Sequence, residues 1–304
     1  MGLLRALLDV ILPVVLVAGV GALLARRFPL DRTTVTKIAL NALTPALALQ
    51  TILTTEVSGR VGLLLALGFV LLTLIAAGLG WLSAVGQPSL TRRSAAVAVS
   101  IGNNGNMGLP ISLFALGQAG LDQSVLIFIL SVVLTFVVAP LLYGAHQGWR
   151  GALIGMARLP ALWAMAVGLV IRTLGISLPT GVTRGIDLLA AATLPMILLT
   201  LGIQLGSTGR VRLTGPVVIS SLLRVAVLPA LALPLGYAVG LRGISLQAFV
   251  LSAAMPTAVN AFILAHEYDG DVEFVAHTVT VTTLLSFASA AVVTALLPWI
   301  GSLG

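Results

Sequence analysis

Long apolar blocks alternate with short polar segments along the chain. A helix needs about 20 apolar residues to cross a bilayer, and ten blocks are of this kind: 3–25, 35–55, 61–85, 94–118, 122–144, 152–174, 185–206, 214–240, 245–267 and 274–299. Only helices and closed barrels satisfy their backbone hydrogen bonds in lipid. The sequence lacks the alternating segments of about ten residues that a barrel requires. The pattern predicts an all-α integral membrane protein with ten transmembrane helices.

Composition narrows the class further. Of the 304 residues, 59% are hydrophobic and 8% are charged, whereas about a quarter of a soluble domain is charged. This excludes a soluble globular protein, a disordered chain and a fibrous repeat. Ten spans with short loops fill the length, so we expect no separate catalytic domain. Because there is no cysteine, disulfides, thiolate metal sites and cysteine nucleophiles are also excluded.

The net charge of +7 could indicate a nucleic-acid partner, but the basic residues stand singly or in pairs between apolar blocks. That placement is typical of topology signals, and we expect the lipid bilayer, and no nucleic acid, as a partner. Ten basic residues follow odd-numbered spans: Arg26, Arg27, Arg32, Lys37, Arg92, Arg93, Arg150, Arg158, Arg210 and Arg212. Five lie on the opposite side: Arg5, Arg60, Arg172, Arg184 and Arg242. This bias predicts a multi-pass protein of the cell's inner (plasma) membrane with both termini outside.

Prolines inside the spans recur at a nearly constant offset. Pro13 and Pro160 are 147 residues apart, Pro45 and Pro195 are 150 apart, and Pro110 and Pro256 are 146 apart. Such an offset predicts two five-span repeats, residues 1–148 and 149–304. Five is odd, so the second repeat enters the membrane inverted, as in many secondary transporters.

The fourth and ninth spans are predicted to be broken. Residues 102–110 contain three asparagines, three glycines and a proline, and a proline again stands beside polar residues at 256–260. Proline removes a backbone donor, and each glycine costs a helix about 1 kcal/mol relative to alanine. Unwound backbone at membrane depth persists only against protein or a watery cavity. Paired broken helices in inverted repeats indicate a transporter binding site where they cross.

An interrupted helix in the membrane offers groups that can bind an ion. A half-helix that begins in mid-membrane exposes free N–H groups and an effective charge of about +0.5, which favours an anion. Nearby amides could donate to a carboxylate, coordinate a cation, or only satisfy freed backbone groups. The candidate ligand-binding residues are Asn103, Asn104, Asn106, Pro110, Pro256, Thr257, Asn260, Arg224 and Asn41.

Three further polar sites have more than one possible role. Arg224, near the middle of the eighth span, could bind a second substrate carboxylate, bind a carbonyl-rich helix end, or snorkel to the surface. Asn41 precedes Pro45 by four residues, so its amide contacts either the ligand or the kinked helix. Glu273 and His277 share a helix face and form either a proton relay or a surface helix-end pair, of which we favour the second.

These motifs resemble those of the auxin efflux carrier family. Gly102-Asn103 followed by Met107-Gly108-Leu109-Pro110-Ile111 is similar to its fourth-span signature. The stretches Ala254–Thr257 and Ala265–Tyr268 resemble its ninth span, Arg224 with Pro229 its eighth, and Thr193-Leu194-Pro195 its seventh. The resemblance implies ten spans in inverted repeats, a scaffold moving against a crossover core, and transport of small organic anions. It also implies that Asn103 lies near the substrate carboxylate, and that a dicarboxylate such as malonate is a better candidate than auxin.

The leading hypothesis is a secondary transporter that moves a mono- or dicarboxylate by alternating access, with no cofactor. The direction of transport, the coupling ion (proton, sodium or none) and a homodimer are left open. The alternative is a sodium-coupled organic anion symporter of the bile-acid-symporter type. A receptor would usually add a signalling domain, which we do not expect here. An intramembrane enzyme is disfavoured, because His146, His266 and His277 fall near span ends and no acid pair lies in mid-span.

Overall fold

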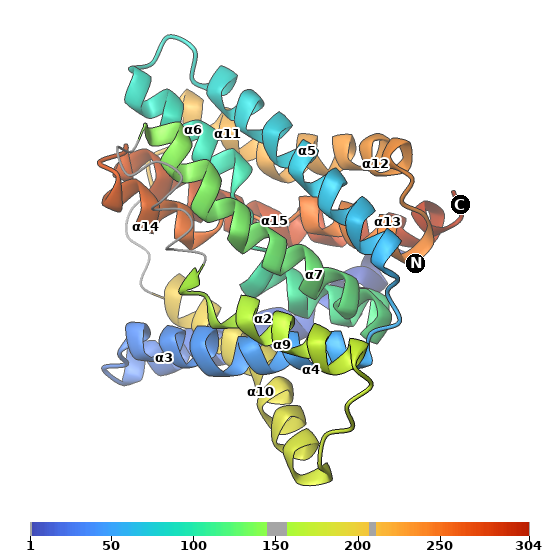
Figure 1. Ribbon diagram of the computed structural model, residues 1–304. Coiled ribbons are helices and arrows are strands. Elements are labelled where there is room, and N and C mark those ends of the chain that lie inside the picture. Colours follow the sequence, from blue (N-terminus) through green and yellow to red (C-terminus); the bar gives the residue numbers. More distant parts are fainter. Residues whose placement is uncertain (1, 145–156, 207–210, 304) are drawn as a thin grey trace. The chain divides into compact units, whose positions relative to one another are not determined.

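The computed structural model describes residues 2–144, 157–206 and 211–303, and in this part every regular element is a helix (Figure 1). The helices of the first half are α1 (Leu3–Arg5), η1 (Ala6–Ile11), α2 (Leu12–Arg27), α3 (Arg32–Ile38), η2 (Ala39–Leu43), α4 (Thr44–Thr54), α5 (Gly59–Ser83), α6 (Ser89–Ser100), η3 (Asn104–Gly108) and α7 (Leu109–Tyr143). Those of the second half are α9 (Pro160–Thr173), α10 (Thr180–Leu205), α11 (Gly215–Leu222), η4 (Leu223–Val227), α12 (Leu228–Val239), α13 (Gly243–Ala253), α14 (Val259–Glu267) and α15 (Val272–Gly301). The all-α prediction is confirmed for the described residues.

Among the residues that the structure describes, six helices are long and apolar enough to cross a bilayer: Leu3–Arg27, Gly59–Ser83, Asn104–Tyr143, Thr180–Leu205, Gly215–Val239 and Val272–Gly301. Pro160–Thr173 and Gly243–Ala253 are apolar but shorter. Within α7 the backbone leaves helical geometry at Gly117 (φ 67°, ψ −162°), near the predicted boundary between the fourth and fifth spans. Several helices can therefore span a membrane, and the count of ten stays a prediction.

The helices form two compact units, and each draws on both halves of the chain. Unit 1 contains the described residues of Met1–Leu12, Ser58–Ala152 and Gly209–Gly304; unit 2 contains those of Pro13–Val57 and Leu153–Thr208. The units therefore differ from the predicted repeats, whose boundary at 148/149 lies outside the described residues. Arg150, Arg210 and His146 lie outside them as well.

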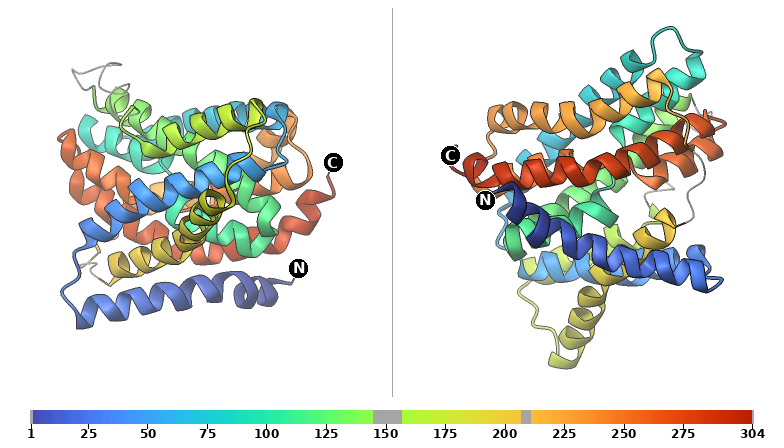
Figure 2. Two further views of the ribbon diagram at one scale, coloured as in Figure 1. Left: turned by 60° about the horizontal axis from the view of Figure 1, so that its bottom comes forward. Right: turned by 180° about the vertical axis from the view of Figure 1, so that it is seen from behind.

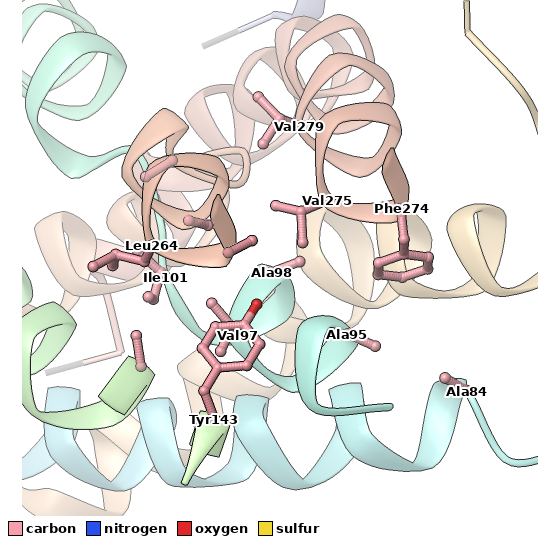
Figure 3. Close-up of a cluster of buried hydrophobic side chains, with 14 of the residues drawn as sticks. Ala84, Ala95, Val97, Ala98, Ile101, Tyr143, Leu264, Phe274, Val275 and Val279 are labelled. Carbon is pink, nitrogen blue, oxygen red and sulfur yellow. The ribbon is translucent and has the colours of Figure 1, made fainter. Parts of the chain in front are cut away.

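Unit 1 surrounds both predicted breaks. Small residues of α6, among them Ala95 and Ala98, pack against α14 and α15 together with Leu264 and Val275 (Figure 3). Ile101, the first residue after α6, is part of the same buried cluster. Figure 2 shows α15 running beside α11 and η4, and the contacts between these elements agree. The unwound backbone after α6 is thereby packed against protein, the condition under which it can persist in a membrane.

In unit 2, α4 packs against α9 and α10 (Figure 1). The backbones of α2 and α10 also approach closely, because a Cβ at Gly21 would collide with the Leu199 carbonyl and one at Gly202 with the Ala18 carbonyl. Thr193 Oγ1 donates to the Leu43 carbonyl (3.0 Å) at the end of η2. Small residues and this hydrogen bond fix the helix packing of the unit.

Four π-helical segments share one position relative to a proline. The segments η1, η2, η3 and η4 each end two residues before a proline, namely Pro13, Pro45, Pro110 and Pro229. A proline ring clashes with the carbonyl four residues earlier, and a widened π turn is one way for a helix to accommodate such strain. The repeat partners in the second half differ, because Pro160 begins α9, Pro195 lies inside α10 and Pro256 lies in a break. Equal spacing of prolines therefore does not produce equal backbone geometry.

Candidate functional site

Both predicted breaks are present in unit 1, and they cross. The first lies between α6 and η3, and the second between α13 and α14. Asn103 N donates to the Pro256 carbonyl (2.7 Å) and Ala258 N to the Ile101 carbonyl (2.9 Å). These bonds form an antiparallel bridge that pairs Gly102 with Thr257. At the crossing, two half-helices end and two begin.

Asn103 shapes the start of the new half-helix. It has non-helical dihedral angles (φ −80°, ψ 58°), and its Oδ1 accepts a hydrogen bond from Asn106 N (3.2 Å). An asparagine in this role is a helix N-cap, which is the backbone-satisfying alternative of the sequence analysis. Its Nδ2, however, donates to no acceptor in the part of the chain that the structure describes. Asn103 therefore caps the helix and still has a free donor.

The side-chain amide of Asn104 has no hydrogen-bond partner among the described residues, whereas its backbone N donates to the Gly102 carbonyl (2.9 Å). Its side chain is 2% exposed, and both Oδ1 and Nδ2 are buried without a partner. Each unsatisfied buried polar group costs a protein about 1–3 kcal/mol, so this amide needs an explanation. Asn106 is half-buried and Pro110 is buried in the following helix. The first break thus carries a buried amide that no described residue satisfies.

The second break is internally satisfied. Thr257 is fully buried; its Oγ1 donates to the Ala98 carbonyl (2.8 Å), and its backbone N donates to Thr282 Oγ1 (3.1 Å). Pro256 is buried, and its carbonyl accepts the bond from Asn103. Asn260 lies on the exposed side of α14.

Arg224 joins the two breaks. It lies in η4 with 4% of its surface exposed. Its Nε donates to the Met255 carbonyl (2.8 Å) and its Nη1 to the Val99 carbonyl (3.0 Å). Of the three alternatives for Arg224, the carbonyl-rich helix ends are therefore the partners of Nε and Nη1. Its Nη2 lies against Gly102, where a Cβ would collide with it.

The remaining candidates lie elsewhere. Asn41 belongs to unit 2, where it is exposed and its Nδ2 donates to the Lys37 carbonyl (2.9 Å), as the kinked-helix alternative predicts. Glu273 pairs with His277 (3.4 Å) and with Arg212 (3.1 Å). The side chains of Glu273 and Arg212 are mostly exposed, so this is a surface ion pair at a helix start.

Sequence reasoning missed the support that α15 gives the second break. Thr278, Thr282 and Ser286 follow one another at intervals of four and are all fully buried. Thr282 accepts the hydrogen bond from the backbone of Thr257. A hydroxyl at every fourth position of an apolar span indicates one polar helix face, a signal that could have identified this stripe.

Comparisons with known proteins identify relatives that are named transporters or carriers. Residues 145–294 match the family model described as "Membrane transport protein". An "Uncharacterized transporter" of Methanothermobacter thermautotrophicus is 28% identical over 85% of this chain and 87% of its own length. A "Putative malonate transporter" of Rhizobium meliloti is 34% identical over 63% of each chain. "Auxin efflux carrier component 1" of Arabidopsis thaliana is 26% identical over 40% of this chain and 20% of its own length.

The family and these relatives are transporters and carriers, none of them an enzyme. Crossing broken helices in an apolar all-helical chain agree with that role. The chain is thus similar to membrane transporters over 85% of its length and to the auxin efflux carriers over 40% of it.

Proposed function

We propose that the protein is a secondary transporter that moves a small organic anion, a mono- or dicarboxylate, across the inner (plasma) membrane by alternating access. The anion is held where the two breaks cross. The observation that carries this proposal is the buried, partnerless side-chain amide of Asn104 at the start of η3. Beside it, Asn103 accepts a hydrogen bond through Oδ1 and keeps its Nδ2 available as a donor. A substrate carboxylate would accept the hydrogen bonds that the protein leaves open.

Electrostatics favour an anion at this place. Two half-helices begin here, at Asn104 and at Val259, and each contributes about half a positive charge at its N-terminus. Residues 100–108 and 254–260 contain no acidic side chain. A cation would be repelled by both helix ends.

Each candidate residue has a place in the proposal. Asn103 and Asn104 donate to the carboxylate, while Asn106 and Asn260 line the approach from the less buried side. Pro110, Pro256 and Thr257 hold the backbone in its broken shape. Asn41 serves its own helix in unit 2, where its Nδ2 donates to the Lys37 carbonyl, and Arg224 acts on the crossing as argued below.

The larger architecture belongs to the same proposal. Ten spans in two inverted repeats, 1–148 and 149–304, with both termini outside, would bring the two breaks together at one depth. The matched prolines and the antiparallel bridge between Gly102 and Thr257 support this arrangement.

One observation favours sodium coupling as the alternative. A small pocket beside the first break, with a volume of about 10 Å³, has Thr73, Ser100, Ser131 and Thr135 in its lining. Each of these hydroxyls donates to a carbonyl of its own helix. Their lone pairs remain as hard oxygen ligands, the kind that hard cations prefer.

The test is binding of malonate to the purified protein, with and without sodium and at two pH values. A ligand at 100 times its Kd stabilises the fold by about 2.7 kcal/mol, a shift that thermal unfolding resolves. Asn103→Ala should weaken malonate binding at least tenfold, whereas Gln87→Ala, which removes an exposed amide, should not change it. Equal affinity in wild type and Asn103→Ala would contradict the proposed site, and an effect of sodium would support the alternative.

A further inference from the structure

Arg224 is a buried arginine without an acidic partner. Its side chain makes no ion pair with any described residue, and its hydrogen bonds go only to carbonyl oxygens. A charge in the middle of a membrane protein is retained only where the surroundings stabilise it. The surroundings of Arg224 must therefore supply negative potential without a carboxylate.

Its two acceptors are the ends of half-helices. Val99 lies in the last turn of α6, and Met255 follows the last residue of α13 by two positions. The C-terminal end of a helix carries about half a negative charge, so the two ends together offer about one. A single guanidinium at this position balances both.

The side chain is held firmly in place. Arg224 lies in the π turn that precedes Pro229, and the adjacent Val225 carbonyl accepts a hydrogen bond from Ser289 of α15. Its Nη2 lies against Gly102, where the Cβ of any other residue would displace it. The glycine, the π turn and α15 together fix the guanidinium between the breaks.

We propose that Arg224 is a positioning residue of the transport site, which clamps the C-terminal ends of α6 and α13 through Val99 and Met255 and cancels their negative potential. The N-terminal ends that begin at Asn104 and Val259 then act on the anion without opposition. This inference rests on the proposed function and adds to it the reason why the crossing attracts an anion. Arg224 acts through the helices and does not contact the substrate.

The charge on the ligand distinguishes this role from direct contact. Malonate, malonamate and malonamide have similar size but carry two, one and no negative charges at neutral pH. In Arg224→Gln, affinity should fall by about tenfold for each charge on the ligand, the size expected for charges roughly 10 Å apart at an effective dielectric constant near 20. Malonamate should therefore weaken about tenfold, malonate more, and any malonamide binding should not change.

Arg224→Lys retains the positive charge and should restore most of the affinity. If Arg224 instead bound a second carboxylate directly, Arg224→Gln would weaken malonate and leave malonamate within twofold. That pattern would overturn the proposal.

A second experiment needs no ligand. Hydrogen–deuterium exchange reports on the amides of Asn103 and Ala258, which form the bridge between the breaks and do not bond to Arg224. Both should exchange at least tenfold faster in Arg224→Gln. Both amides should also exchange faster in Gly102→Ala, because the new Cβ displaces the arginine without removing it. If Arg224→Gln does not fold, this variant tests whether Arg224 clamps the two breaks.

The matched control is Arg172→Gln, which removes another arginine that donates to a carbonyl, that of Ile52 (2.9 Å), in unit 2. It should leave the two bridge amides unchanged. If neither Arg224→Gln nor Gly102→Ala alters their exchange relative to this control, the clamp does not exist. If no carboxylate binds wild type while the exchange changes as expected, the proposed substrate is wrong and the clamp stands.

Discussion

The two breaks cross at one point, yet their buried polar side chains differ in whether they have hydrogen-bond partners. In the second break Thr257 Oγ1 donates a hydrogen bond to the Ala98 carbonyl, and the backbone N of Thr257 donates one to Thr282 Oγ1. In the first break Asn104 is equally buried, but neither atom of its amide has a partner among the described residues. A buried polar group without a partner destabilises a fold, so its persistence indicates a use other than stability. We therefore propose that the second break stabilises the fold and that the first binds the substrate.

Asn104→Leu should produce the largest effect. Removing two unsatisfied polar atoms should leave the free energy of unfolding unchanged or raise it by about 1–3 kcal/mol, while malonate affinity falls at least tenfold because the amide donor is lost. Thermal unfolding and ligand titration on the same sample measure both quantities. A destabilised variant with full affinity would reverse the roles of the two breaks.

Thr282→Val should act in the opposite sense. It leaves the backbone N–H of Thr257 without its acceptor, which should lower the free energy of unfolding by about 1–3 kcal/mol and change malonate affinity less than threefold. Thr283→Val is the matched control, because Thr283 is equally buried but donates only to Val279 of its own helix. If both variants lose the same stability, α15 does not specifically support the second break.

Asn260→Ala tests the exposed side of the second break. Its amide is already exposed, so stability should change by less than about 0.5 kcal/mol, as for most surface substitutions. We expect malonate affinity to fall about threefold, less than for the buried Asn104. A tenfold loss would place the carboxylate nearer to α14 than to η3.

The smallest expected effect is on stability at alkaline pH. It arises at Tyr268, the residue that follows α14. Burial, and then the charge of Glu267, raise the pKa of Tyr268 above its usual value of 10.0. The neutral phenol is thus favoured in the folded state, so this contribution to stability is complete below pH 10 and is lost as the pH rises through the higher folded pKa. Tyr268→Phe should make thermal unfolding less dependent on pH in this window. An unchanged pH dependence would show that the phenol does not titrate with folding.

Local features of the breaks could be read from the sequence. Proline and glycine act within one helical turn, so the run from Gly102 to Pro110 and the proline at 256 located both interruptions. The π turn before Pro45 was anticipated only as a kink. The same reasoning could not tell Asn103, which caps a helix, from Asn104, which has no partner, because the two neighbours have the same side chain.

The sequence by itself determined that this chain is an apolar, all-helical protein with two interrupted helices rich in hydrogen-bonding groups. It did so because hydropathy and backbone propensity depend on residues close together in the chain. The tertiary structure alone decided which groups are satisfied: Arg224 reaches carbonyls 125 and 31 residues away, and Thr257 reaches one 159 residues away. Those partners come together only when the chain has folded and the two breaks cross. The crossing leaves the side-chain amide of Asn104 without a partner among the described residues.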